Sequence, residues 1–363
     1  MEKFAHALNL VPGMSYQIMA KFWKRFRNWQ TVWQADIQAF FEAGLSREMV
    51  SSLVNARKRI DVEKEFRQLV QKNVVAIGRD HGEFLPLLKE IPDPPFLLYR
   101  RGAPLEDGQK YVAMVGTRRA STYGAQIAFQ LSEAISLQGG IVVSGLAFGI
   151  DARAHAAAVQ NKKSTVAILA SGVTNVTPAS HINLAENILR HNGTILSEYI
   201  YGEPSYKGRY LARNRLISGL CQATIVIEAH EKSGALITAH HALEQNRQIF
   251  ALPGDITRAQ ARGCLRLIAS GAQPIVAIEE TLVDLGFASL PRQLQLFDAQ
   301  EELVFAAIQK NPASTDELLG NIYSKLQNGL SIDLPQLSVI LSRLELKGAI
   351  HKNEAMQWQI ARV

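Results

Sequence analysis

Between residues 110 and 280, short apolar runs alternate with stretches that have the helical period. Runs that are apolar throughout are typical of strands buried on both faces, and their alternation with helices favours a doubly wound, mostly parallel α/β sheet. The predicted strands are Tyr111–Val115, Ile141–Val143, Thr165–Leu169, Thr194–Leu196, Ala223–Ile227, Gln248–Ala251 and Pro274–Val276. The predicted helices between them are Gly124–Leu137, Asp151–Gln160, His181–Asn192, Arg213–Gly219, Ala235–Asn246 and Gly263–Ser270.

The segments on either side of this region have the pattern of small helical domains. Helices are predicted at Tyr16–Trp29, Thr31–Ala43 and Ser46–Leu69, and the proline-rich run Ile91–Pro95 ends this part. Near the C-terminus, three helices and a hairpin are typical of a winged-helix domain: Gln300–Gln309, Thr315–Leu319, Leu334–Lys347, Gly348, and strands Ile350–Lys352 and Gln357–Ile360. We therefore predict domains at 1–90, 91–287 and 300–363, with a linker at 288–299.

Two glycine-rich loops follow the first and second predicted strands. In doubly wound sheets, ligands bind outside the carboxyl ends of the strands. Gly116 and Gly149 would let the backbone approach an anion, and Arg118 and Arg119 would add bidentate contacts to phosphate. Neither loop contains G-x-G-x-x-G or the lysine of a P-loop, which disfavours a nucleotide triphosphatase.

A second basic segment contains Lys207, Arg209, Arg213 and Arg215. These residues would share one face if the chain were extended and would spread around a helix. Together with Arg118 and Arg119 they could line a groove for a sugar–phosphate backbone. The alternative for each arginine is a solvated surface charge or an internal ion pair.

Composition and charge limit the remaining classes. The chain of 363 residues is 47% hydrophobic and 20% charged, which excludes wholesale disorder. Two cysteines, Cys221 and Cys264, provide neither a disulfide framework nor a four-cysteine zinc site. The sequence has neither the pattern of a signal peptide nor that of a membrane span, so we expect a cytoplasmic protein without a membrane partner. The net charge is +6, of which residues 1–105 contribute +5 and residues 300–363 contribute −1.

The candidate acid–base groups do not form a catalytic set. Asp151 and His155 could share one helix face, but we expect Asp151 to cap its helix and His155 to pack on the sheet. The histidines lack the spacing of metal ligands, and Ser144 is not in a G-x-S-x-G motif. We therefore predict no catalytic residues and no metal.

Taken together, the ordered motifs resemble the DprA/Smf family of DNA-processing proteins. The motifs are Val115–Arg118 with Tyr123-Gly124, Ser144–Asp151, Ser197–Tyr199, Arg213–Arg215, Ser233–Ala239, Pro253-Gly254 and Gly263–Ala272. The resemblance implies an extended Rossmann-type core that binds single-stranded DNA with no cofactor and no reaction, a SAM-like helical domain before it and a winged-helix domain after it. It also implies protection of incoming DNA during natural transformation and loading of the RecA recombinase.

By motif position, Arg118 falls on the DNA-contacting arginine of the family, and Lys207 on a basic residue before the Arg-Asn-Arg element. The expected DNA-contacting residues are Gly116, Thr117, Arg118, Arg119, Ser144, Gly145, Phe148, Gly149, Lys207, Arg209, Arg213, Asn214, Arg215, Ser233 and Gly234. Family members form dimers through the core, and we place that contact at Leu265 and Ile268. The chain has Thr177-Pro178 where the family commonly has Tyr-Pro, and Tyr210-Leu211 where it commonly has Phe-Pro, so a base-stacking ring would have to be Tyr210 or Tyr206.

Two other functions remain open at this point. A Rossmann-type nucleotide phosphoribohydrolase, related to the lysine-decarboxylase-like proteins, draws slight support from Glu228 and Pro253-Gly254, but its Pro-Gly-Gly-x-Gly-Thr loop is absent. A winged-helix transcription regulator would grip duplex DNA with the C-terminal segment, whose charge balance of −1 is unfavourable for that role.

Overall fold

The computed structural model describes residues 1–288, 299–323, 333–346, 349–353 and 356–360. The chain divides after Ala288 into two compact units. The predicted linker therefore lies almost entirely outside the described residues, as does Gly348. The domain boundaries chosen from the sequence remain predictions.

The first unit is built on one sheet of nine strands, in the order β1-β2-β6-β5-β4-β3-β7-β8-β9. The strands from β3 to β9 pair with one another in parallel, while β2 pairs antiparallel with both β1 and β6. The strands are β1 (Val75–Gly78), β2 (Leu97–Gly102), β3 (Tyr111–Val115), β4 (Ile141–Ser144), β5 (Thr165–Ile168), β6 (Thr194–Ser197), β7 (Ala223–Val226), β8 (Gln248–Ala251) and β9 (Gln273–Pro274). The predicted doubly wound α/β fold is confirmed. The last strand is shorter than predicted and ends before Val276.

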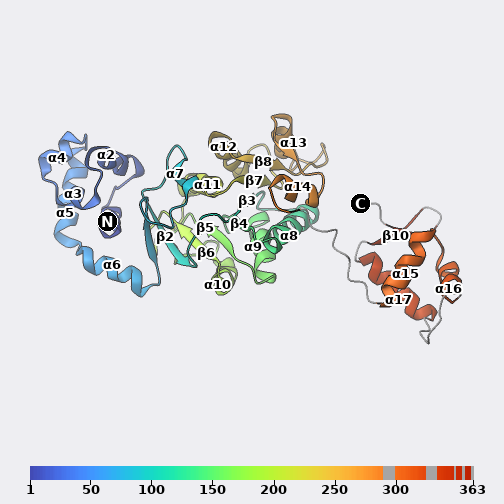
Figure 1. Cartoon of the computed structure of the whole chain (residues 1–363). Coiled ribbons are helices and arrows are strands. Elements are labelled where there is room, and N and C mark those ends of the chain that lie inside the picture. Colours follow the sequence, from blue (N-terminus) through green and yellow to red (C-terminus); the bar gives the residue numbers. More distant parts are fainter. Residues whose placement is uncertain (289–298, 324–332, 347–348, 354–355, 361–363) are drawn as a thin grey trace. The chain divides into compact units, whose positions relative to one another are not determined.

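Helices cover both faces of this sheet, with α8, α9 and α10 on one side and α11 and α12 on the other (Figure 1). The helices of the core are α7 (Pro86–Lys89), α8 (Thr122–Leu137), α9 (Ile150–Gln160), η1 (Ala179–His181), α10 (Ile182–Arg190), α11 (Lys207–Gly219), α12 (Gly234–Glu244), α13 (Arg262–Ala269) and α14 (Ile278–Asp284). Most of the predicted helices agree within a residue or two. Helix α11 is the exception, because it begins at Lys207 rather than at Arg213.

The N-terminal region has more elements than predicted. Its helices are α1 (Glu2–Asn9), α2 (Tyr16–Phe26), α3 (Trp29–Gln34), α4 (Ile37–Glu42), α5 (Arg47–Arg59) and α6 (Val62–Gln71). The predicted helices Thr31–Ala43 and Ser46–Leu69 are each divided at an aspartate whose carboxylate caps the second part. Asp36 accepts from the Ala39 N–H at 2.8 Å, and Asp61 from the Glu63 N–H at 3.0 Å. Strand β1 lies within the segment 1–90 and pairs with β2 at the edge of the sheet.

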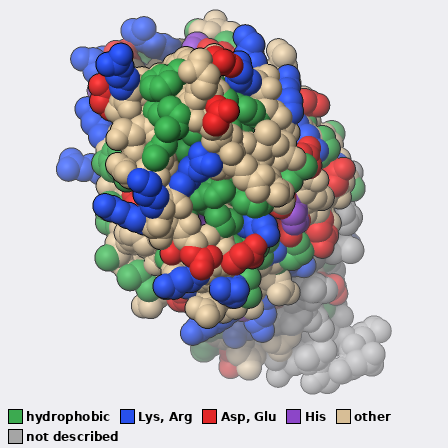
Figure 2. Space-filling view, turned by 90° about the vertical axis from the view of Figure 1, so that its left-hand side faces the viewer, with side chains coloured by type: hydrophobic (Ala, Val, Ile, Leu, Met, Phe, Trp, Pro, Cys, Tyr) green, Lys and Arg blue, Asp and Glu red, His purple; other side chains and the backbone are tan. Residues whose placement is uncertain are grey.

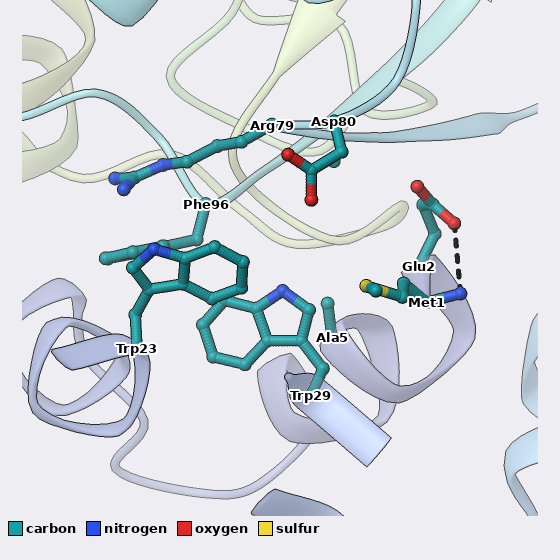
Figure 3. Close-up of a pocket in the computed structure, with 9 residues that line it drawn as sticks. Met1, Glu2, Ala5, Trp23, Trp29, Arg79, Asp80 and Phe96 are labelled. Atoms are coloured by element: carbon teal, nitrogen blue, oxygen red, sulfur yellow. Dashed lines mark ion pairs between the residues drawn. The ribbon is translucent and has the colours of Figure 1, made fainter. Parts of the chain in front are cut away.

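An aromatic junction joins the N-terminal helices to the core (Figure 3). Phe96, just before β2, has its ring centroid 5.5 Å from that of Trp29 and 6.2 Å from that of Trp23. The Arg79 guanidinium lies 3.7 Å from the centroid of the Phe96 ring and donates to backbone carbonyls of the proline-rich run. The cavity left among these side chains is only about 10 Å³, so the contact is closely packed.

The second unit has helices α15 (Ala299–Lys310), α16 (Thr315–Tyr323) and α17 (Leu334–Leu346), followed by antiparallel strands β10 (Ile350–Lys352) and β11 (Trp358–Ile360). This order agrees with the prediction of three helices and a hairpin. Leu318, Leu337, Leu341 and Trp358 are among the side chains of its small core.

Candidate nucleic-acid interface

The loops after β3 and β4 meet at the carboxyl edge of the sheet. The Ile150 N–H donates to the Thr117 carbonyl at 3.2 Å. Gly149 has a φ of +76°, and a Cβ placed on it would lie 2.3 Å from the Thr117 oxygen. Only glycine fits this close approach, so the glycine of the second loop serves to pack it against the loop that carries Arg118.

A doubly wound fold commonly binds a cofactor phosphate at the N-terminus of a helix such as α8. In this protein the carboxylate of Glu228 occupies that position. Glu228, which follows β7, accepts from the Ser121 N–H at 2.8 Å and from the Ser121 hydroxyl at 2.6 Å. A Cβ on Gly124 would lie 2.6 Å from a Glu228 oxygen. The carboxylate therefore fills the anion position between β3 and β7, where the strand order reverses.

A second internal carboxylate holds the loop after β4. Asp151 accepts from the Gly145 N–H at 3.1 Å and from the Ala147 N–H at 3.3 Å. Burial raises the pKa of Asp151, and the nearby charge of Arg213 opposes that rise. The prediction that Asp151 caps its helix is wrong, because Gly149 occupies the N-cap position of α9 and the Asp151 carboxylate anchors the preceding loop.

Three of the predicted cations lie exposed at this edge: Arg118, Arg119 and Lys207. The Arg118 guanidinium lies 5.2 Å from the centroid of the Tyr210 ring, in the first turn of α11. This contact brings the loop after β3 next to the helix that begins at Lys207. Within the described part of the chain, none of the three forms an ion pair.

The other three cations are turned inward, which corrects the prediction that all six face one groove. Because α11 begins at Lys207, the basic residues spread around a helix. Arg213 is 4% exposed and donates to the carbonyls of Gly145 and Ile168. Arg215 is 5% exposed and pairs with Glu198 at 2.7 Å and Asp93 at 2.9 Å.

Arg209 is also held internally. It pairs with Glu203 at 3.0 Å, donates to the Pro204 carbonyl at 2.8 Å, and lies between the rings of Tyr199 and Tyr206. Its role here is to brace the loop from β6 to α11, and Tyr206, 57% exposed, is left at the surface.

Some of the remaining predicted contact residues are also buried, and others are exposed. Ser144 is buried and its hydroxyl donates to the Met114 carbonyl at 2.6 Å, while Asn214 is nearly buried and donates to the Gly234 carbonyl at 3.2 Å. Gly234 itself is exposed at the start of α12, which Ser233 caps. Phe148 is 48% exposed, with its ring 4.9 Å from that of His181.

The groups considered for catalysis, Ser144, Asp151 and His155, all make internal hydrogen bonds. His155 is buried, with Nδ1 2.9 Å from the Thr165 hydroxyl, and burial lowers its pKa to about 3, so the ring is neutral near pH 7. Among the described residues, no group of three or more His, Cys, Asp or Glu side chains is arranged to hold a metal ion, and no helix is long and apolar enough to cross a bilayer.

Leu265 and Ile268, the predicted dimer contacts, are half-buried on α13. Ile268 packs against the core cluster, together with Leu267. Sequence reasoning did not anticipate the carboxylate of Glu228 at α8 or the pairing of Glu198 with Arg215, since both join residues far apart in the chain.

The fold and this edge place the chain among the α/β proteins with a doubly wound sheet. In this chain, glycine-rich loops and exposed cations share the carboxyl edge of that sheet. Residues 75–286 match the family model of DNA recombination-mediator protein A. The chain belongs to this family, which includes the DprA and Smf DNA-processing proteins.

Relatives and solved structures agree with this assignment. Protein Smf from Synechocystis is 30% identical over 97% of both chains, and DNA processing protein DprA from Bacillus subtilis is 40% identical over 70% of this chain and 88% of its own. The X-ray structure of DprA from Streptococcus pneumoniae covers 79% of this chain and 99% of its own, with a TM-score of 0.68 and 29% identity. A structure that describes the single-stranded DNA binding mode of DNA processing protein A from Helicobacter pylori covers 59% of this chain and 97% of its own, with a TM-score of 0.52 and 28% identity.

Proposed function

We propose that this protein is a non-enzymatic mediator that binds single-stranded DNA at the carboxyl edge of its sheet and hands the strand to a RecA-type recombinase. The observation that carries the proposal is the meeting of exposed Arg118, Arg119 and Lys207 at one edge, next to exposed rings. Membership of the DNA-processing family and the single-strand binding reported for the Helicobacter pylori protein support it.

The chemistry of this edge suits a flexible polynucleotide. Arginine and lysine side chains without a carboxylate partner are available for phosphates, and Tyr206 and Phe148 offer faces on which bases can stack. Stacking tolerates every base, so the binding should have little sequence preference and a strong dependence on salt. Lys207 and Arg118 are the residues from which we expect the largest contributions.

The phosphoribohydrolase alternative loses its structural support. Glu228, which might have served such an enzyme, is nearly buried and its carboxylate is held by Ser121. It occupies the place where a nucleotide phosphate would bind in a fold of this type. We therefore propose no second function.

The proposal includes two protein partners, a second copy of this chain and a recombinase. We place a homodimer contact on the half-buried apolar face of α13, at Leu265 and Ile268, and the recombinase as the acceptor of the bound strand. Replacement of either apolar residue by a charged one should produce monomers in sedimentation analysis. Wild-type sedimentation behaviour of such a variant would move the contact elsewhere.

The DNA-binding proposal is tested by fluorescence anisotropy with labelled oligo-deoxythymidine. Arg118→Ala should weaken binding about 10-fold, because it removes a charged phosphate contact worth about 1.5 kcal/mol. Arg190→Ala is the matched control, since Arg190 is an exposed arginine at the C-terminal end of α10, at the opposite edge of the sheet. Equal dissociation constants for wild type and Arg118→Ala would refute the site.

A further inference from the structure

A groove of about 810 Å³ runs between the N-terminal helices and the core. One wall is the turn from α1 to α2, residues 9–16, together with Met19. The other wall is the loop from β6 to α11, residues 198–206, together with the exposed side of α11. The aromatic junction fixes this space, because Trp23 and Trp29 of the helical region pack on Phe96 of the core (Figure 3).

Tyrosines are concentrated in the lining of this groove. Tyr199, Tyr201 and Tyr206 come from the core side, and Tyr16 comes from the first turn of α2. Rings of this kind serve as stacking platforms for the bases of single strands, whatever the base. Tyr206 is 57% exposed and directly precedes Lys207, the first residue of α11. The groove is therefore continuous with the edge that carries Arg118.

A buried ion pair, formed by Arg215 and Glu198, also lines the groove. Arg215 is 95% buried, and two of its nitrogens are held by Glu198 and Asp93. Its Nη1 has no hydrogen-bond partner among the described residues. The Nη1 atom is itself buried, so Arg215 shapes the groove through its ion pairs and presents no accessible N–H to it. The first turn of α2, capped by Ser15, borders the same space and favours an anion there.

The surface around the helical region has the charge that a polyanion requires. Figure 2 faces this end of the molecule and shows Lys and Arg side chains distributed around a band of hydrophobic ones. Lys21, Lys24, Arg25 and Arg27 are among the exposed cations of α2 and its end. Their field would draw a strand toward the groove, without fixing its position.

We propose that the groove is a second subsite for single-stranded DNA, which takes the part of the strand that extends past Tyr206 from the sheet edge. This inference rests on the proposed function, because it extends the same bound strand. The tyrosines would stack on bases, and the N-terminus of α2 would lie beside a phosphate of the strand. The N-terminal helices thereby lengthen the binding site rather than only flanking the core.

The test compares binding of a short and a long oligo-deoxythymidine, of about 6 and about 20 nucleotides, by fluorescence anisotropy. Met14→Glu and Pro12→Glu each place a carboxylate on the helical wall, away from the sheet edge. Met14→Leu is the control for packing at the same position, and Gln30→Glu makes the same charge change at an exposed site of α3 outside the groove lining. A thermal melt of each variant checks that it folds, and Pro12, which is exposed, provides the second variant should Met14→Glu fail to do so.

The two glutamate variants should bind the long oligonucleotide at least about 5-fold more weakly than wild type, because a carboxylate on the groove wall repels the phosphates and would displace about one stacked base, worth about 1 kcal/mol. Binding of the short oligonucleotide should not change. Gln30→Glu and Met14→Leu should bind both as wild type does. Wild-type affinity of folded glutamate variants for the long strand, or an equal loss for both lengths, overturns the subsite. Failure of the proposed function looks different, since Arg118→Ala would then bind the short strand as wild type does.

Discussion

Glu228→Gln tests whether an internal carboxylate organises the loop that presents Arg118. Glu228 is 7% exposed and accepts two hydrogen bonds from Ser121, at 2.8 Å from the backbone N–H and 2.6 Å from the hydroxyl. It also faces the positive N-terminal end of α8. Glutamine has the same size and can still accept one of the two bonds, so the substitution removes mainly the charge.

The magnitude follows from those contacts. Hydrogen bonds to charged groups contribute about 1.5–3 kcal/mol each, and an anion at a helix N-terminus contributes about 0.3–1 kcal/mol. Since glutamine keeps one acceptor, we expect the free energy of unfolding to fall by about 2 kcal/mol. Urea unfolding of the full chain measures this through tryptophan fluorescence, because Trp23, Trp29 and Trp33 all lie in the first unit.

A double-mutant cycle with Ser121→Ala shows whether the loss belongs to this contact. The two substitutions should be less than additive, with a coupling energy of about 1 kcal/mol. A change below about 0.5 kcal/mol for Glu228→Gln, within the range of ordinary surface substitutions, would refute the reasoning.

Three further predictions concern the buried polar groups and the exposed lysine. Burial lowers the pKa of His6, whose Nδ1 lies 2.9 Å from the Tyr99 hydroxyl in the packing of α1, to about 4 and that of His155 to about 3. The unfolded chain therefore takes up protons first below pH 6.5, and each histidine should reduce the free energy of unfolding by about 2 kcal/mol between pH 7 and pH 5. His6→Gln should flatten that pH profile, and an unchanged profile would contradict this expectation. Glu198→Gln leaves the buried Arg215 with Asp93, which is partly exposed, as its only carboxylate partner, and should lower the free energy of unfolding in urea by about 3 kcal/mol. A change near zero would mean that the pair with Glu198 does not stabilise the fold. Lys207→Ala should reduce the slope of log binding constant against log salt by about 0.7, the value for one phosphate on a single strand, and an unaltered slope would remove Lys207 from the interface.

The sheet could be predicted from the sequence because its central strands are apolar on both faces. The run Tyr111–Val115 is apolar throughout, and Ala223–Ile227 is apolar except for Thr224. Short runs of this kind favour buried strands, and both strands lie where they were expected. Strand β1, which is only Val75–Gly78, was missed, although the polar pair Lys72-Asn73 separates this apolar run from the preceding helix. The divided helices were predictable in principle, as Asp36 and Asp61 are residues that commonly cap helices.

The roles of the arginines could not be predicted from spacing. Arg213 and Arg118 were both expected to face one groove, yet Arg213 is buried against Gly145 and Arg118 is exposed beside Tyr210. The difference depends on where α11 begins and on which carboxylates the fold brings near it. Such long-range pairing leaves no periodic trace in a single sequence.

Hydrogen–deuterium exchange with and without oligo-deoxythymidine tests the central claim most directly, because it maps where the strand lies on the intact protein. Bound DNA should slow exchange in residues 116–121 and 203–210, which carry the exposed cations and Tyr206, and should leave the amino edge of the sheet unchanged. If DNA binds but slows exchange only in the second unit, and not in these two segments, the proposed site is wrong.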